Sequence, residues 1–186
     1  MAIKTFTTGE VLTASDTNTY LANAGLVFVA STTFSASSGV EVSNCFTSTY
    51  DNYKILITYY GSSASNTTWQ MMTGTNTKEN GSVYYRYGYY WTSFINNLNS
   101  GPNTSDFITN HGTTASIYSF AEITCFRPNV SGVRTSSLIQ AYDPASSLVI
   151  TTTETVATTT AYTGFYFFPA AGNITGTITV YGYRKP

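Results

Sequence analysis

The sequence predicts an all-β fold, an antiparallel β-sandwich. Beyond residue 25 the chain is a succession of short segments rich in β-branched and aromatic residues, each bounded by turn residues. Within several segments apolar and polar residues alternate, which is the pattern of a strand with one face toward a core. No helical period separates the segments to supply the crossovers of a parallel sheet. These three observations favour two antiparallel sheets packed face to face.

The first 25 residues are expected to form an extended arm that contains one short helix. Thr13 or Ser15 could cap the backbone N–H groups of the turn that follows. Nothing in this stretch has the composition of an active site. We therefore divide the chain into an N-terminal arm, residues 1–25, and a β-sandwich domain, residues 26–186.

Ten strands are expected in the sandwich domain. Their ranges are 26–30, 39–42, 53–60, 69–72, 83–90, 116–126, 136–142, 148–153, 162–168 and 174–183. Alternation is clearest in 117–125, where the odd-numbered residues from Ile117 to Cys125 oppose Tyr118, Phe120, Glu122 and Thr124. In the last segment Ile178 and Val180 alternate with Thr177, Thr179 and Tyr181. One face of each of these strands is expected to meet the core.

The strand number and the long connection at residues 92–114 make a jelly roll the leading topology, with a simpler immunoglobulin-like sandwich as the alternative. Residues 92–114 are rich in Asn, Ser and Gly, and residues 151–160 are rich in Thr. Both stretches are expected to be loop or edge. Because Thr is β-branched and favours extended backbone, residues 151–160 could be an exposed edge strand whose polarity discourages aggregation.

The composition limits the partners of this chain. Charged residues make up only 9% of it and the net charge is −1. Such a surface suits a protein outside the cell or packed in an assembly, because neutral polar groups cost less to bury than charges. The eight Lys and Arg residues are scattered, which argues against nucleic acid as a partner. The longest apolar run, residues 26–30, is too short to span a membrane, and residues 1–4 lack the apolar stretch of a signal peptide.

The titratable residues offer little for catalysis. His111, in an expected turn at residues 110–112, could form a triad with Asp106 and a serine, but no nucleophile elbow surrounds any serine. A solvated loop histidine is therefore expected. A glycan-cleaving site would need two facing carboxylates, and each candidate lies alone in its segment; the candidates are Glu41, Asp51, Glu122, Asp143 and Glu154. We expect no catalytic residues and no enzymatic activity.

The two cysteines are expected to be buried thiols rather than a disulfide. Cys45 and Cys125 each precede a Phe and are each expected inside a strand, facing the core. Together with His111 they match none of the usual metal-ligand spacings. The sequence therefore predicts no metal and no other cofactor.

An aromatic cluster at residues 84–94 is the one local feature that indicates recognition. Alternation in a strand would place Tyr85, Tyr87 and Tyr89 on one face. Tyr84 and Tyr90 would share the other face with Arg86, so rings would cover both. Because Tyr and Trp are enriched at protein interfaces, a subunit interface is favoured over ordinary core and over a receptor or glycan contact. The interface or receptor residues would be Tyr85, Tyr87, Tyr89, Tyr90 and Trp91.

Two segments of the chain resemble parts of tailed-bacteriophage virion structural proteins. Residues 9–14, Gly-Glu-Val-Leu-Thr-Ala, are followed by Asp16 and by Asn-Thr-Tyr-Leu at 18–21, and together they look like the start of many such proteins. Residues 174–184 are similar to the closing strand of small β-domains in tail appendages and head decorations. The middle of the chain carries no such resemblance.

This resemblance implies a homotrimeric structural protein of the virion that is attached through its N-terminal segment, with the β-domain facing outward. Its partners would be further copies of itself, other virion proteins and a host surface glycan. Docking of the arm would then rest on Gly9, Val11, Leu12, Tyr20 and Leu21.

The position in the particle has two readings. A tail component, such as a fibre or baseplate appendage, is favoured. A capsid decoration or cement protein on the head is the alternative, since so short a chain has no room for a long shaft or a separate tip domain. A hypothesis of another class is a carbohydrate-binding module, which would use Tyr87, Tyr89 and Trp91 and would not need the arm.

Overall fold

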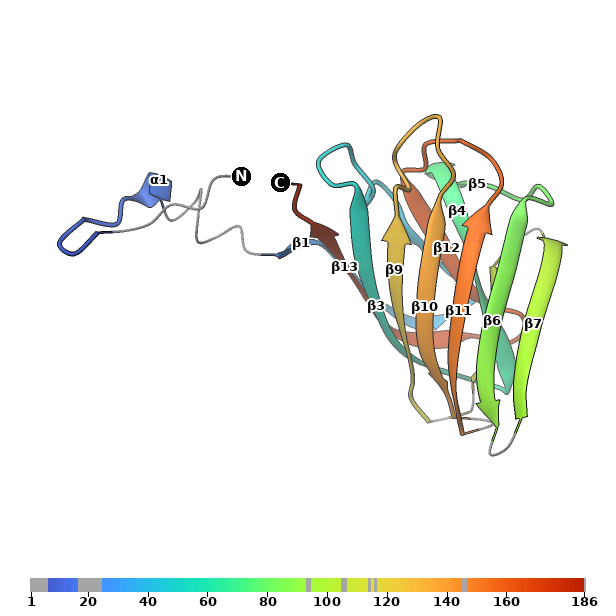
Figure 1. Ribbon diagram of the computed structural model, residues 1–186. Helices are drawn as coiled ribbons and strands as arrows, with labels where there is room; N and C mark the ends of the chain where they lie inside the picture. The colour runs from blue at the N-terminus through green and yellow to red at the C-terminus, as the bar shows by residue number, and fades with distance from the viewer. Residues whose placement is uncertain are drawn as a thin grey trace.

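The computed structural model describes residues 7–16, 25–92, 95–104, 107–113, 115, 117–144 and 147–185, with the backbone alone described within residues 87–112. Two antiparallel sheets pack face to face in a sandwich-like arrangement (Figure 1), which confirms the all-β prediction.

The large sheet has eight strands in the order β1-β13-β3-β9-β10-β11-β6-β7 within the described residues. All neighbouring pairs are antiparallel. Their bounds are β1 Leu26–Ser37, β13 Ile174–Tyr183, β3 Asn52–Gly61, β9 Ser119–Phe126, β10 Ser136–Asp143, β11 Leu148–Val156, β6 Tyr84–Thr92 and β7 Ile95–Thr104.

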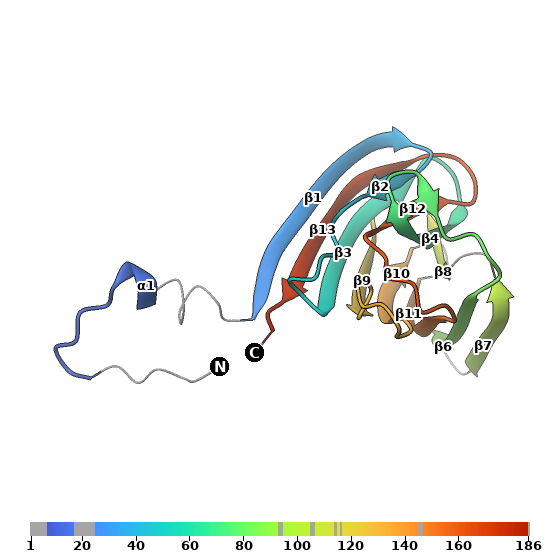
Figure 2. The ribbon, with the colours of Figure 1, turned by 90° about the horizontal axis from the view of Figure 1, so that it is seen from above.

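The small sheet has five strands among the described residues. Its path is β2-β12-β4-β5, and β8 also pairs with β4, through residues 65–69. The bounds are β2 Val40–Val42, β12 Gly164–Pro169, β4 Ser65–Gly74, β5 Thr77–Lys78 and β8 Phe107–Thr113. Seen from above, β1, β13 and β3 arch over the small sheet, so that the large sheet curls around it (Figure 2).

The core between the sheets is rich in aromatic rings. Tyr59 of β3 in the large sheet meets Phe167 of β12 in the small sheet edge to face at 5.1 Å between ring centroids. Within the small sheet, Trp69 of β4 meets Phe165 of β12 at 5.9 Å. Such edge-to-face pairs contribute about 0.5–1.5 kcal/mol beyond the area that they bury. The largest fully buried side chains include Trp69, Tyr53, Tyr59, Tyr84, Tyr162, Phe46, Phe165 and Phe167. Aromatic packing therefore supplies much of the contact between the two sheets.

All ten expected strand segments overlap strands of the structure, and the alternation was predicted correctly in both of the clearest cases. In β9, Ala121, Ile123 and Cys125 are buried while Phe120 is exposed. In β13, Ile178 and Val180 are buried. Ile117 is the exception: it is exposed because it lies ahead of β9 and outside the packed part of the sheet.

Residues 92–114, expected to be loop or edge, hold all of β7 and β8, because polar Asn- and Thr-rich segments can still pair through their backbones. Within the described residues β7 lies at the edge of the large sheet and β8 pairs with β4 alone, in agreement with the edge alternative. Two other sequence expectations about topology are not confirmed. Residues 151–156 belong to β11, which is not an edge strand: it lies between β10 and β6, and Thr152 and Glu154 are buried. The strand order does not confirm a jelly roll, since β9, β10 and β11 are consecutive neighbours in one sheet.

We predict that replacing Gly176 by Ala lowers the free energy of unfolding by about 1–3 kcal/mol, the usual cost of overpacking. A Cβ at Gly176 in β13 would overlap the carbonyl oxygen of Thr58 and the backbone of Tyr59 in β3. Urea denaturation measures this change. Gly74→Ala is the control, because its Cβ would meet only Thr77 Oγ1, at 3.9 Å. Equal stability of the two variants would contradict the prediction.

Candidate functional site

The arm contains one turn of helix that Thr13 caps, as the sequence predicts. Helix α1 spans Ala14–Asp16. The backbone N–H of Asp16 donates to Thr13 Oγ1 at 3.0 Å, while the backbone N–H and the hydroxyl of Thr13 donate to Asp16 Oδ2 at 3.2 and 2.6 Å. These reciprocal bonds form a capping box with Asp in place of the usual Glu or Gln. Ser15 lies inside the helix and is not the cap.

The docking residues that fall in the described part of the arm are exposed. Gly9 lies in a turn with φ 88°, where the left-handed backbone favours Gly. Val11 is 78% exposed and Leu12 is 49% exposed. Tyr20 and Leu21 lie outside the described residues. In Figure 1, α1 lies outside the sandwich. No helix among the described residues has the length and apolar character to cross a membrane.

An aromatic patch covers part of the outer face of the large sheet. We call it the outer patch; it consists of Tyr60, Tyr118, Phe120, Tyr142 and Val149. The exposed fractions of Tyr118, Phe120 and Val149 are 59%, 51% and 53%. The Tyr60 and Tyr118 rings meet edge to face at 5.1 Å, and the Phe120 and Tyr142 rings stack at 5.8 Å.

Strand pairing makes the outer patch continuous across β9, β10 and β11. Tyr142 pairs with Phe120 on one side and with Val149 on the other. Directly opposite residues of an antiparallel pair lie on the same face with Cβ atoms about 4.5–5.5 Å apart. Sequence analysis did not select this patch. The signal was present in the alternation, which placed Tyr118 and Phe120 on the polar face with Glu122 and Thr124.

The predicted tyrosine cluster falls on β6. Tyr84 is a core residue: it is fully buried, its hydroxyl donates to Glu79 O at 2.8 Å and accepts from the Met71 backbone N–H at 3.0 Å. Tyr85 is half-buried. In register, Tyr85, Tyr87 and Tyr89 pair with Thr155, Thr153 and Thr151 of β11, Tyr90 pairs with Ile150, and Trp91 pairs with Asn96 of β7.

The side chains of Tyr87, Tyr89, Tyr90 and Trp91 lie outside what the structure describes, so their interface or receptor role stays a prediction.

Glu154 is a fully buried carboxylate at the centre of the sandwich. Its Oε2 accepts a hydrogen bond from Trp69 Nε1 at 2.9 Å, which joins β11 of the large sheet to β4 of the small sheet. The register places Arg86 of β6 directly opposite Glu154. Opposite charges at directly opposed positions stabilise a strand pair. We therefore assign Glu154 a structural role.

The other acids proposed as catalytic candidates lie apart from one another and mostly in ion pairs. Glu122 pairs with Lys54 at 2.8 Å, Glu41 with Lys78 at 3.2 Å and Asp51 with Lys185 at 2.8 Å. Asp143 is buried. Within the described ranges, no three His, Cys, Asp or Glu residues gather in a way that could hold a metal ion.

His111 lies in strand β8 and not in a turn, which corrects the sequence expectation. Residues 107, 108, 112 and 113 of β8 pair with β4, and His111 lies at the register irregularity between the two paired ends of the strand. Its partner in the suggested triad, Asp106, lies outside the described residues.

Both cysteines are buried thiols, as expected, although Cys45 lies in the connection between β2 and β3 rather than in a strand. Its Sγ–H donates to Val42 O at 3.4 Å. Burial raises the pKa of Cys45 to about 12 and raises that of Cys125 well above its usual value. Because the thiolate is the nucleophile, neither cysteine is reactive at neutral pH.

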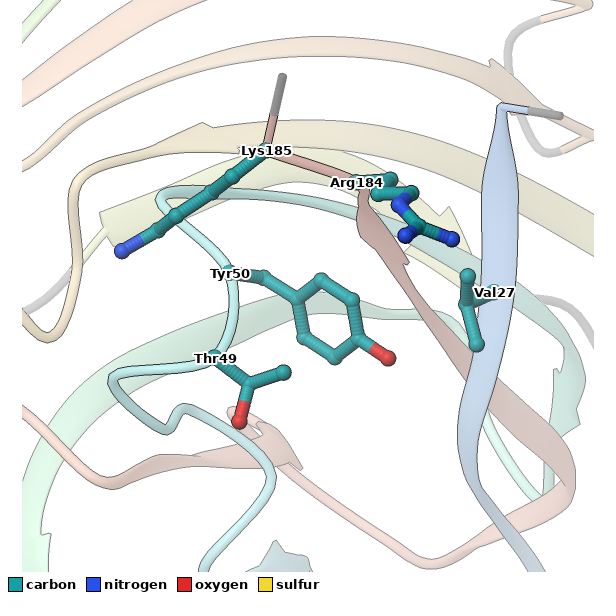
Figure 3. Close-up of a pocket in the computed structure, with 5 residues that line it drawn as sticks. All are labelled: Val27, Thr49, Tyr50, Arg184 and Lys185. Carbon is teal, nitrogen blue, oxygen red and sulfur yellow. The ribbon is translucent and has the colours of Figure 1, made fainter. Parts of the chain in front are cut away.

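A pocket of about 310 Å³ lies where the start of β1 and the segment that follows β13 come together. It is lined by Val27, Thr49, Tyr50, Arg184 and Lys185 (Figure 3). In the sequence, Arg184 and Lys185 are two of the eight scattered cations. No local pattern joins them to Tyr50, because the pairing of β13 with β1 and β3 is what brings these segments together.

Comparisons of the chain with family models, with curated proteins and with solved structures found no match. The function is therefore argued from the arm, the outer patch and the pocket.

We predict that the free energy of unfolding falls as the pH rises above about 9. Burial raises the pKa of Cys45 from 9.0 and of Tyr59 from 10.0, each to about 12, and raises that of Cys125. The unfolded chain therefore loses these protons first, and its deprotonation favours unfolding by up to about 1.4 kcal/mol per pH unit for each group.

Urea midpoints at pH 8 and pH 10.5 measure this effect. Cys45→Ala is the control, because it removes one of the groups and should reduce the difference between the two midpoints. Identical midpoints at the two pH values for the unaltered chain would contradict the prediction.

Proposed function

We propose that this chain is a structural protein of a tailed-bacteriophage particle, a homotrimeric component of the tail that is anchored through its N-terminal arm. The β-sandwich is the domain that faces outward, and copies of the chain meet through the large sheet. The family assignment and the trimer rest on the resemblance of residues 9–21 and 174–184 to virion proteins.

The observation that carries the proposal is the outer patch. Soluble monomers rarely expose large contiguous apolar patches, and exposed aromatic clusters mark interaction sites. Tyr118, Phe120 and Val149 are each about half exposed. Phe120 of β9 and Val149 of β11 flank Tyr142 of β10, and Tyr118 directly precedes β9. Tyr and Phe are enriched at the centres of protein interfaces because they bury a large area with few rotatable bonds. The patch therefore supports contact between copies.

The surroundings of the patch suit such contact. The ion pair of Lys54 with Glu122, on the same face of the sheet, carries no net charge. The remaining side chains on this face of β10 and β11 are neutral, such as Gln140, Thr151 and Thr153. An interface formed here would bury few uncompensated charges, which are costly to desolvate.

The arm supports attachment to a different partner. Val11 and Leu12 lie directly before the capped helical turn, and both are exposed. Two apolar side chains on a short segment outside the sandwich suit insertion into a groove of another virion protein.

The proposal is tested by the solution mass of the purified chain, measured by light scattering over a range of concentrations, with and without residues 1–25. We expect a mass about three times the chain mass of 20.2 kDa in both forms, since the sheet holds the trimer and the arm serves attachment. A monomer at all concentrations would refute the homotrimer.

We predict that the double substitution Tyr118→Ser and Phe120→Ser dissociates the trimer into single chains. The sandwich should keep its circular dichroism spectrum, because both side chains lie on the outer face. Gln140→Ser is the matched control: this residue is exposed on the neighbouring strand, and its loss should leave the mass unchanged. A double variant that stays trimeric would exclude the outer patch as the interface.

A further inference from the structure

The pocket at the junction of β1 and β13 is separate from the outer patch. Val27 of β1 pairs with Gly182 of β13, and Gly182 follows the core residues Ile178 and Val180 at intervals of two. Residues at such intervals lie on one face of a strand. The pocket therefore extends the core-facing side of the large sheet past the end of the core, whereas the outer patch lies on the opposite face.

The Tyr50 ring forms a fixed wall of this pocket. A Cβ at Gly182 would overlap the ring, so the glycine lets the ring lie directly against β13. The ring also meets Tyr53 edge to face at 5.9 Å. Figure 3 shows the Tyr50 hydroxyl directed toward Val27, with the Arg184 guanidinium at the same end of the ring. A rigid ring, a hydroxyl and a cation thus face the same space.

The two cations of the pocket differ in their electrostatic state. The Lys185 ammonium donates to Asp51 Oδ1 at 2.8 Å and to Ser48 O at 2.9 Å, so its charge is compensated. In Figure 3 it points away from the Tyr50 hydroxyl. The Arg184 guanidinium forms no ion pair with any carboxylate in the described part of the chain. Its backbone N–H donates to Gly25 O at 3.2 Å, which holds its main chain beside the first strand.

We propose that this pocket binds a single sugar ring that carries a carboxylate, a hexuronic acid. A single guanidinium that forms no ion pair within the described residues suits one negative charge, and the planar fork of Arg pairs with a carboxylate through two parallel hydrogen bonds. A phosphate dianion would call for a second available cation, and Lys185 is engaged with Asp51. The volume of about 310 Å³ is near the lower limit of ligand pockets, about 300 Å³, which suits one ring and not a chain of sugars.

The remaining lining suits the rest of such a ring. The hydroxyls of Tyr50 and Thr49 can donate to and accept from sugar hydroxyls. The Tyr50 ring carries partial negative charge on its face, which favours contact with the C–H groups of a pyranose. This site goes beyond the assembly role and does not depend on it, because it uses neither the outer patch nor the arm residues Val11 and Leu12.

The test is ligand-observed saturation-transfer NMR on the full chain with sodium glucuronate, glucose and sodium acetate at equal ionic strength. We expect saturable binding of glucuronate, with glucose and acetate each at least about tenfold weaker, since each lacks half of the recognition. Equal binding of acetate and glucuronate would mean a simple anion contact, and equal binding of glucose would mean that the guanidinium has no role. Either result, or no binding of glucuronate, would overturn the proposal.

Two variants test whether glucuronate binds in this pocket. Arg184→Gln should weaken glucuronate binding at least about tenfold and leave the weak glucose signal unchanged. Arg134→Gln is the matched control, because Arg134 is an exposed arginine in the connection that precedes β10. Unchanged binding in Arg184→Gln, or an equal loss in Arg134→Gln, would place the sugar elsewhere. The comparison of the three ligands on the unaltered chain decides the ligand class even if a variant fails to fold.

Discussion

The hydrogen bond from Trp69 to Glu154 is the contact around which the two sheets are arranged. It joins the middle of β4 to the C-terminal part of β11 in a region where both side chains are fully buried. A buried carboxylate is costly unless it is hydrogen-bonded and faces an opposite charge, and the register with Arg86 places that charge on the neighbouring strand. A shift of β11 by one residue would turn Glu154 to solvent and Thr153 into the core. This interaction therefore defines which face of β11 is internal.

The alternation of side chains along its strands gives the large sheet an internal and an outer face. Each face carries a different candidate functional surface. The internal face carries the aromatic core and ends in the pocket beside Gly182. The outer face carries neutral polar residues together with the rings of the outer patch. Because opposite faces of one sheet serve the two surfaces, assembly through the outer patch would leave the pocket on the side away from that interface.

Much of the fold was predictable from local pattern, and the failures have physical causes. Alternation in Ile178 and Val180 or in Ala121 and Ile123 reflects one buried face, which requires no knowledge of the partner strand. Strands β7 and β8 were missed because their Asn, Thr and Gly residues lack that pattern and are held by backbone pairing. The outer patch and the pocket were not predicted, because each joins segments that only the strand order brings together. Tyr50 and Arg184, for example, are far apart in the sequence and line the same pocket.

The position of β13 in the large sheet has a consequence for how the chain reaches its native state. The last strand lies between β1 and β3, so that the first strand has no partner in the large sheet until residues 174–183 have been synthesised. Pairing between the two ends of a chain requires closing a long loop and slows folding. During synthesis β1 is an unpaired edge that could associate with other chains. Completion of the sheet is therefore a late, long-range step, and removal of residues 174–186 would leave β1 without the strand that it pairs with among the described residues.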